Sequence, residues 1–236
     1  MSKKSSDVVS RYLVLGIASL VAIFVFGAIL LNNRPRAVDQ ELMDLIQGLP
    51  KGVTAEGLPY LGEADAPVTM IIYEDLACPH CRNFYFEVEP DVLRDYVATG
   101  QVKMVIYIIA IVSQQSLPGA EGVACAQDQD MFWEYRDALY NNQGVRLYNR
   151  ENMTAIAGEL GLDEDIFSRC FDFSQHTQEV SDRSQAAFQF GIQSTPTTEV
   201  LGVRYPGELP FDREAAEGVL PGIKQILEAA LLEAGV

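Results

Sequence analysis

Two cysteines three positions apart are the first candidates for chemistry in this chain. They lie in the stretch Cys78-Pro79-His80-Cys81. An apolar, β-rich run precedes the pair and a helical pattern follows it, so the cysteines are predicted to lie where a buried strand ends and a helix begins. A thiolate, rather than a thiol, attacks disulfides, and the partial positive charge at a helix N-terminus stabilises a thiolate. The pattern therefore predicts a redox-active pair.

Each residue of this motif has a distinct expected role. Cys78 is predicted at the exposed start of the helix, as the attacking sulfur. Cys81 lies one helical turn further along, close enough to close a short disulfide or to resolve a mixed one. Pro79 occupies a first-turn position, where its missing N–H costs nothing. His80 adds a polar neighbour that can carry a positive charge.

A zinc half-site and a pair of inert thiols are the alternatives to a redox pair. Structural zinc needs four ligands, and the other cysteines and histidines of the chain form no second close pair. We therefore expect no metal and no cofactor. A metal-handling protein that uses Cys78, His80 and Cys81 is the weaker alternative.

Composition and charge narrow the class of protein. The chain has 236 residues, of which 48% are hydrophobic and 21% charged, enough apolar side chains to bury a core. Its net charge is −16, but residues 1–36 hold five basic side chains and one acidic one, whereas residues 37–236 hold 12 basic and 32 acidic side chains. A body this acidic repels phosphate backbones, so we expect no nucleic-acid partner.

The N-terminal region carries a candidate membrane anchor. Residues 12–31 form a run of 20 residues without a charge, and a helix of that length crosses a hydrocarbon core of about 30 Å. A cleaved signal peptide is the alternative, but the run ends in Asn32-Asn33-Arg34-Pro35, which offers no small-residue cleavage site. We therefore predict an uncleaved single-pass anchor after a cytoplasmic leader over residues 1–11, with the body of the chain outside the cytoplasm.

Hydrophobic periodicity predicts an α/β core with a long helical interruption. A strand over 68–73, a helix over 82–98 that Pro90 kinks, and a strand over 102–111 make a parallel crossover unit. Helical patterns fill most of the region between residues 117 and 190, at 120–126, 131–142, 152–160, 164–171 and 175–190. The chain then returns to short strands at 197–200 and 202–205 and closes with a helix over 212–234, interrupted at Pro221-Gly222. Before the core, we expect a short helix over 37–47 and a small strand near 58–61.

This combination resembles a known family. The strand–CxxC–helix unit resembles the thioredoxin superfamily, and the Pro-His dipeptide with the helical insertion is similar to its DsbA-type branch. Further stretches of the family pattern occur in the expected order, at residues 65–69, 132–139 and 191–197. The resemblance covers residues from about 58 to 234. It implies a thioredoxin-like domain (58–116 and 191–236), a helical insertion domain (117–190) and a linker (32–57).

The resemblance also implies a second part of the active site. The Thr195–Pro196 bond is expected to be cis and to pack beside the reactive pair, where the Thr195 backbone can pair with an extended substrate and its hydroxyl can contact sulfur. One departure concerns the buried acid that many relatives carry six residues before the first cysteine, because that position is Ile72 here. Glu74 is a candidate displaced proton acceptor, or alternatively an ordinary acid at a strand end.

The remaining cysteines fall in separate predicted helices of the insertion. In an oxidising compartment, Cys125 and Cys170 are candidates for a structural disulfide, and some relatives of this branch carry an extra bridge there. Two buried, unpaired thiols are the alternative.

The leading hypothesis is a membrane-tethered thiol:disulfide oxidoreductase, a dithiol oxidase that introduces disulfides into secreted or surface proteins in their unfolded or reduced state. By family resemblance, a quinone-linked membrane partner reoxidises it. A reductase or isomerase of the same fold is the first alternative. The second is a non-catalytic thioredoxin-like binding module that uses the groove near Pro196.

Overall fold

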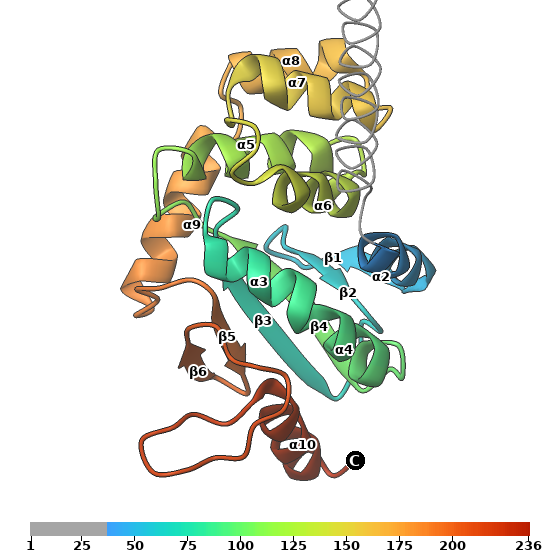
Figure 1. Ribbon diagram of the computed structural model, residues 1–236, viewed down its shortest axis with the longest axis vertical. Helices are drawn as coiled ribbons and strands as arrows, with labels where there is room; N and C mark the ends of the chain where they lie inside the picture. Colours follow the sequence, from blue (N-terminus) through green and yellow to red (C-terminus); the bar gives the residue numbers. More distant parts are fainter. Residues whose placement is uncertain (1–36) are drawn as a thin grey trace, which may run out of the picture. The chain divides into compact units, whose positions relative to one another are not determined.

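The two most apolar, β-rich runs of the chain form the central strands of the sheet. In the computed structural model, which describes residues 37–236, these strands are β3 (Val68–Glu74) and β4 (Val102–Ile108). They pair in parallel along their whole length, from Val68 opposite Val102 to Glu74 opposite Ile108. The predicted crossover, in which one strand follows another through a helix, is therefore confirmed (Figure 1).

The predicted leader (1–11) and membrane anchor (12–31) lie outside the described residues. Within residues 37–236, no helix has both the length and the apolar character needed to cross a membrane.

Short strands complete a six-stranded sheet in the order β1-β2-β4-β3-β5-β6. These strands are β1 (Lys51–Val53), β2 (Pro59–Leu61), β5 (Thr197–Val200) and β6 (Val203–Pro206). β2 pairs antiparallel with β4, and β5 pairs antiparallel with β3. The sequence pattern missed β1, which pairs with β2 but has no buried residue of its own, so no hydrophobic alternation signals it.

Alternate residues of β3 face two different layers. Val68, Met70 and Ile72 are fully buried in the main core, which includes residues of the first helix after the strand and of the C-terminal helix. Ile71 and Tyr73 belong to a second, smaller core on the opposite face. Because successive side chains of a strand point to opposite faces, a strand covered on both sides reads as one continuous apolar run.

The helix that follows β3 is divided into three parts. They are α3 (Pro79–Glu87), α4 (Glu89–Val92) and a π-helical turn, η1 (Leu93–Val97). The interruption falls at Val88, where φ is −118°, two residues before the predicted kink at Pro90. Proline removes one helical hydrogen bond and its ring clashes with the preceding turn, so the distortion lies on its N-terminal side.

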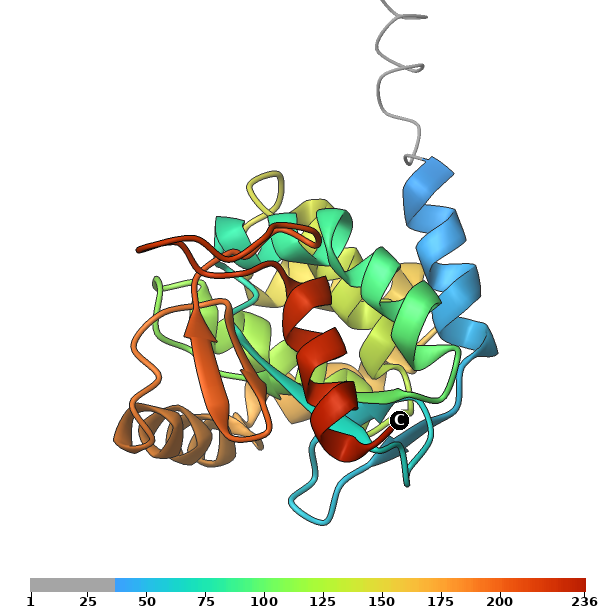
Figure 2. The same ribbon diagram turned by 90° about the horizontal axis from the view of Figure 1, so that it is seen from below.

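The C-terminal helix is shorter than the pattern predicted. Only α10 (Ile223–Ala234) forms, and an irregular segment replaces the first part of the expected helix over 212–234. Gly222 is extended and its N–H donates to the carbonyl of Arg213, which turns the chain back before α10 begins. α10 lies beside the α3–α4 segment, and both contribute to the main core (Figure 2).

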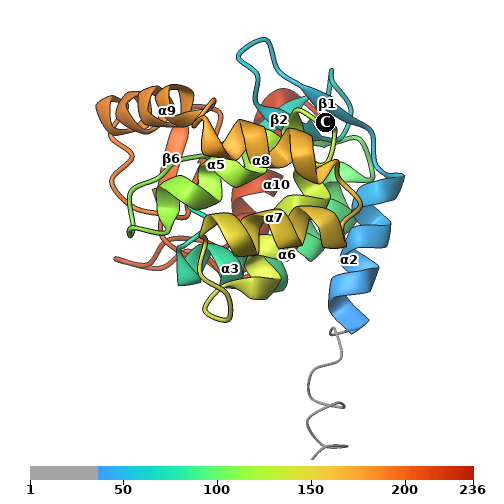
Figure 3. The same cartoon turned by 90° about the horizontal axis from the view of Figure 1, so that it is seen from above.

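Five helices lie between β4 and β5, as the periodicity predicted. Their bounds are α5 (Ser116–Gln127), α6 (Phe132–Asn142), α7 (Arg150–Glu159), α8 (Glu164–Asp172) and α9 (Thr177–Gln189). α5 to α8 pack together, and α9 extends away from that group (Figure 3). α9 also packs against β4. Further upstream, α2 (Ala37–Gly48) buries Leu42 and Ile46 in the main core.

A buried ion cluster joins the helical segment to the sheet. The guanidinium of Arg136 on α6 donates to both carboxylate oxygens of Glu74, at 2.6 and 2.7 Å, and to both of Glu89, at 2.8 and 2.7 Å. All three side chains are almost fully shielded from solvent. Tyr85 and Tyr140 stack their rings against the guanidinium, at 4.6 and 5.4 Å from it.

Removing the cation from this cluster should strongly destabilise the protein. Arg136→Leu leaves two buried carboxylates without their partner, a loss that typically costs about 3–5 kcal/mol. Urea unfolding of the purified protein measures it. Arg94→Leu, which breaks an exposed pair with Asp91, is the matched control and should cost less than about 1 kcal/mol. Equal losses of unfolding free energy in the two variants would show that the buried cluster contributes no more to stability than an exposed ion pair.

Candidate active site

The loop between β3 and α3 sets the position of the reactive cysteine. Cys78 is the N-cap residue of α3 and Pro79 is its first helical residue, as predicted. The prediction that Cys78 is exposed was wrong, because only 4% of the residue is exposed. The carboxylate of Asp75 holds this loop, because it accepts from the amide of Ala77 at 2.9 Å and from the amides of Ile111 and Val112 at 2.8 and 2.9 Å. The sequence analysis did not single out Asp75, although an Asp at the start of a turn is a typical Asx-turn signal.

The two sulfurs have different surroundings. Cys78 Sγ donates to the carbonyl oxygen of Thr195 at 3.3 Å, and the Thr195–Pro196 peptide bond is cis. Cys81 Sγ is 1% exposed and accepts from the amide of Asp75 at 3.5 Å. Both cysteines are free thiols in the structure. Segments more than 110 residues apart in the chain therefore meet at one sulfur atom.

The pKa values of the two thiols are shifted in opposite directions. The pKa of Cys78 is lowered from 9.0 to about 6, chiefly because the Cys81 thiol donates to the Cys78 thiolate. Thr195 and the amides of Cys81 and His80 lower the pKa further and outweigh the effect of burial. Burial raises the pKa of Cys81 well above its usual range. At neutral pH the negative charge therefore resides on Cys78, and Cys81 holds the proton.

An exposed ion pair supports His80, the residue between the cysteines. His80 Nδ1 lies 2.6 Å from a carboxylate oxygen of Glu208, which raises the pKa of the imidazole. The charge of the Cys78 thiolate also raises it, so the imidazolium and the thiolate stabilise each other. The sequence analysis missed Glu208, because 128 residues separate it from His80 and no local pattern marks it.

The helical segment contributes two positioning side chains. Gln143, directly after α6, donates to the carbonyl oxygens of Leu76 and Cys78 at 2.8 and 3.1 Å. The hydroxyl of Tyr148 lies within hydrogen-bond distance of the carbonyl oxygens of Leu76 and Leu139, at 3.1 and 2.9 Å, and shares its one proton between them. Satisfying these buried carbonyls fixes the backbone that carries Cys78. The chain carries no local signal for either contact.

The role proposed for Glu74 is not supported by its contacts. Glu74 lies at the end of β3 and is 1% exposed, but both of its carboxylate oxygens are occupied by Arg136. A carboxylate held in this way is poorly placed to accept a proton from a thiol. Its negative charge instead raises the pKa of Cys81, so that it acts on the site at a distance.

The second cysteine pair forms the expected bridge. Cys125 on α5 and Cys170 on α8 are joined by a disulfide, with 2.03 Å between the sulfurs. The bond links two helices of the segment between β4 and β5. The four cysteines thus divide into a reactive pair of thiols and a bonded pair.

A pocket of about 180 Å³ opens beside the reactive pair. Ala77, which precedes Cys78, and Gln143 form part of its wall, and Tyr148 another part. Two strongly exposed apolar side chains, Val145 and Leu147, also line it. The site therefore presents an apolar surface next to the sulfur.

A low-pKa sulfur with a protonated partner is the working group of thiol–disulfide exchange, and here it occupies the start of a helix beside a cis-proline loop. Fold and site together define a DsbA-like thiol:disulfide oxidoreductase, as the sequence predicted. The chain belongs to the thioredoxin family, whose model, described as "Thioredoxin", matches residues 54–214.

Relatives and solved structures agree with this assignment. Disulfide bond formation protein D of Bacillus subtilis is 26% identical over 167 residues, which cover 66% of this chain and 72% of the relative. The probable disulfide bond formation protein D of Bacillus cereus is 28% identical over 149 residues. These residues cover 60% of this chain and 69% of the relative.

The fold matches those of solved relatives at low sequence identity. Oxidised BdbD from Bacillus subtilis superposes with a TM-score of 0.64 at 22% identity, over 78% of this chain and 98% of its own. DsbA from Chlamydia trachomatis superposes with a TM-score of 0.62 at 19% identity, over 78% of this chain and 96% of its own.

Titration of the reactive sulfur should reveal its low pKa. The rate at which iodoacetamide alkylates Cys78 in the reduced protein should rise with pH around a midpoint of about 6, because only the thiolate reacts. Since the pKa is lowered in the folded state, the reduced protein should also gain stability as pH rises from about 6 toward 9, and lose it as pH falls through 6. A midpoint near that of a free cysteine would contradict this assignment.

Glu208 should tune the same sulfur through His80. In Glu208→Gln the pKa of His80 falls, because its carboxylate partner is gone, and less positive charge then faces the thiolate. The alkylation midpoint of Cys78 should therefore move to higher pH. The exposed acid Glu217, changed to Gln, is the matched control and should leave the midpoint unchanged. If both variants show the same alkylation midpoint, Glu208 does not influence the pKa of Cys78.

Proposed function

We propose that this protein is a membrane-tethered dithiol oxidase that acts outside the cytoplasm on reduced or unfolded proteins. The observation that carries the proposal is the charge asymmetry of the two sulfurs, with the pKa of Cys78 near 6 and that of buried Cys81 well above its usual range. Whatever stabilises the thiolate of the reduced form makes the disulfide form a stronger oxidant. An asymmetric pair of this kind favours accepting electrons from client thiols.

The reaction proceeds through two exchanges. A client thiolate attacks Cys78 Sγ of the Cys78–Cys81 disulfide, and Cys81 leaves and takes up a proton. A second client thiolate then attacks the client sulfur of the mixed disulfide, and Cys78 leaves as a thiolate. The client loses two electrons and gains a disulfide, whereas the cysteine pair gains both electrons. The low pKa of Cys78 makes it the better leaving group in the second step.

Client binding uses the surface around the sulfur. The loop that contains Thr195 and the cis bond lies against Cys78, where its backbone can pair with an extended polypeptide. The adjacent apolar pocket, which Val145 and Leu147 help to line, suits the apolar side chains that unfolded proteins expose. The clients are therefore reduced polypeptides recognised by backbone and apolar contacts.

Location and reoxidation rest on the sequence and the family. The uncharged run at residues 12–31 supports an anchor, and residues 117–190 a domain inserted between 58–116 and 191–236. Most of the predicted linker over 32–57 belongs to the folded body, because Leu42 and Ile46 lie in the main core and β1 pairs with β2. The Cys125–Cys170 disulfide supports an oxidising compartment. Relatives carry the name disulfide bond formation protein. A quinone-linked membrane protein that removes the two electrons completes the proposed cycle.

The redox potential of the full-length protein tests the direction of the reaction. After equilibration with glutathione buffers, an oxidase should show a potential above about −180 mV, and it should speed disulfide formation in a reduced client. A potential near that of thioredoxin, about −270 mV, would instead favour a reductase. Activity only on a client with scrambled disulfides would favour an isomerase.

Two variants separate catalysis from simple binding. Cys81→Ser should accumulate mixed disulfides with the client, because the resolving sulfur is missing and Cys78 remains. Cys78→Ser should lose both the oxidase activity and the covalent complex. Full function in Cys78→Ser would show that the protein is a non-catalytic binding module.

A further inference from the structure

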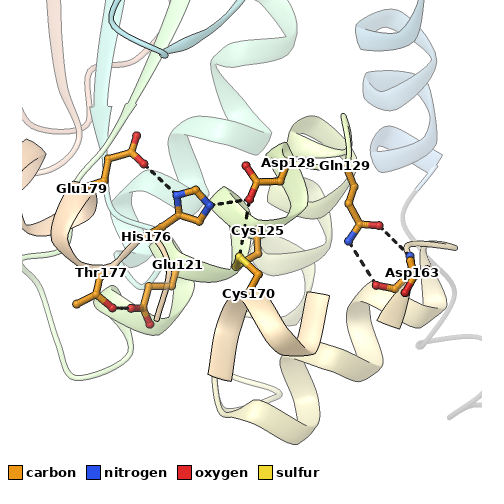
Figure 4. The surroundings of a disulfide bond; sticks show 9 residues. All are labelled: Glu121, Cys125, Asp128, Gln129, Asp163, Cys170, His176, Thr177 and Glu179. Carbon is orange, nitrogen blue, oxygen red and sulfur yellow. Dashed lines mark hydrogen bonds and ion pairs between the residues drawn. A yellow bond between two sulfur atoms is a disulfide. The ribbon is translucent and has the colours of Figure 1, made fainter. Parts of the chain in front are cut away.

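The Cys125–Cys170 disulfide lies within a group of metal-ligand side chains that the redox reaction does not use. His176, directly before α9, and Asp128, at the end of α5, both lie against the bonded sulfurs (Figure 4). The two sulfurs and one imidazole nitrogen lie within 4.8 Å of one another. A disulfide that serves only as a covalent staple needs no such neighbours.

The side chains lie near the spacing of a single tetrahedral centre. A carboxylate oxygen of Asp128 lies 2.8 Å from His176 Nε2 and 3.9 Å from Cys170 Sγ. Zinc bonds of about 2.0–2.3 Å place tetrahedral ligand atoms about 3.2–3.8 Å apart. Two pairs are closer than this, the two sulfurs at 2.03 Å and the Asp128–His176 pair at 2.8 Å. Reduction of the disulfide lets the sulfurs separate, and a metal ion would replace the hydrogen bond between Asp128 and His176. Both cysteines are buried and 18% of the His176 side chain is exposed, whereas 49% of the Asp128 side chain is exposed, so the site is open to solvent on the Asp128 side.

The imidazole is already oriented as a metal ligand. Its other nitrogen, Nδ1, lies 2.9 Å from a carboxylate oxygen of Glu179, which Arg183 also contacts. A carboxylate behind the distal nitrogen fixes the ring and strengthens the facing nitrogen as a ligand, an arrangement typical of zinc sites. Glu121, which accepts from the hydroxyl of Thr177, adds acidic character on the same side (Figure 4).

We propose that Cys125, Cys170, His176 and Asp128 bind one Zn²⁺ ion when the disulfide is reduced, so that the bridge and the metal are alternative states of one site. A dithiol reductant supplies the two electrons and two protons that convert the disulfide to two thiols, and is itself oxidised to a disulfide. Zn²⁺ then displaces both thiol protons and, where the imidazole is charged, its Nε2 proton. Loss of two electrons to a disulfide oxidant restores the bond and releases the ion.

Zinc is the metal that this donor set favours. Two thiolates and an imidazole are soft or intermediate ligands, and a single carboxylate completes four-coordinate geometry. Calcium and magnesium prefer all-oxygen sites with six or more ligands. The ion would join α5 and α8 in the reduced chain at the same place where the disulfide joins them in the oxidised one. A reduced chain could therefore keep this helix pair together before its own bridge forms.

Cobalt binding tests the proposal on the full-length chain with Cys78→Ser and Cys81→Ser, which removes the other thiols. The protein is reduced with a phosphine, freed of it without oxygen, and titrated with Co²⁺. One equivalent should give the intense visible bands of tetrahedral cobalt and a sulfur-to-cobalt charge-transfer band, and Zn²⁺ should abolish both. The oxidised form should bind no Co²⁺ at this site. Absence of thiolate–cobalt bands in the reduced chain would overturn the proposal.

Variants of the other ligands distinguish a built site from adventitious binding to two thiols. In the same background, His176→Gln and Asp128→Asn should each weaken binding at least tenfold. Glu179→Gln, which leaves all four ligands in place, should weaken it about 10–100-fold. Asp165→Asn, an exposed acid on α8, is the matched control and should bind as the parent does. Equal affinity in all four variants would show that the thiols alone hold the metal.

Discussion

The stabilised negative charge on one sulfur atom is the interaction on which the rest of this architecture depends. A thiolate needs donors and a positive environment, and the start of α3 supplies both through the amides of His80 and Cys81. A second segment, the loop before Pro196, also contacts this sulfur, because the Cys78 thiol donates to the carbonyl oxygen of Thr195. The sheet order places that loop beside Cys78, because β5 pairs with β3.

Different hydrogen bonds and surrounding charges give the two buried cysteines of the pair different roles. Cys81 is shielded from solvent and lies near the negative charge of Glu74, so it retains its proton and donates to its neighbour. Glu74 is itself held by Arg136, which also neutralises Glu89. The cluster therefore confines negative charge near Cys81 without leaving it unpaired, and the same side chains join the sheet to α6. The contacts of Arg136 with Glu74 and Glu89 therefore serve both the stability of the fold and the pKa of Cys81.

The helices between β4 and β5 are part of the site as well as a cover for it. Gln143 and Tyr148 fix the backbone before and at Cys78, and residues between them line the adjacent pocket. The disulfide between α5 and α8 constrains this segment at a separate point. Substitutions in this helical segment, more than 60 residues after Cys78, can therefore alter the position of its sulfur.

The sequence by itself determined the reactive pair, the fold class and the order of most elements, because each depends on local pattern. Cys78 and Cys81 follow an apolar β-run and open a helix, and the central strands and the five inserted helices formed where periodicity indicated. Only the tertiary structure decided the contacts between distant segments. The partners in three contacts, Glu208 beside His80, Arg136 between two glutamates and His176 beside Asp128, are separated in sequence by more than forty residues, so no local spacing encodes these contacts. Glu74 illustrates the physical reason. The sequence shows that an acid follows the strand, but its role depends on Arg136, which only folding places beside it.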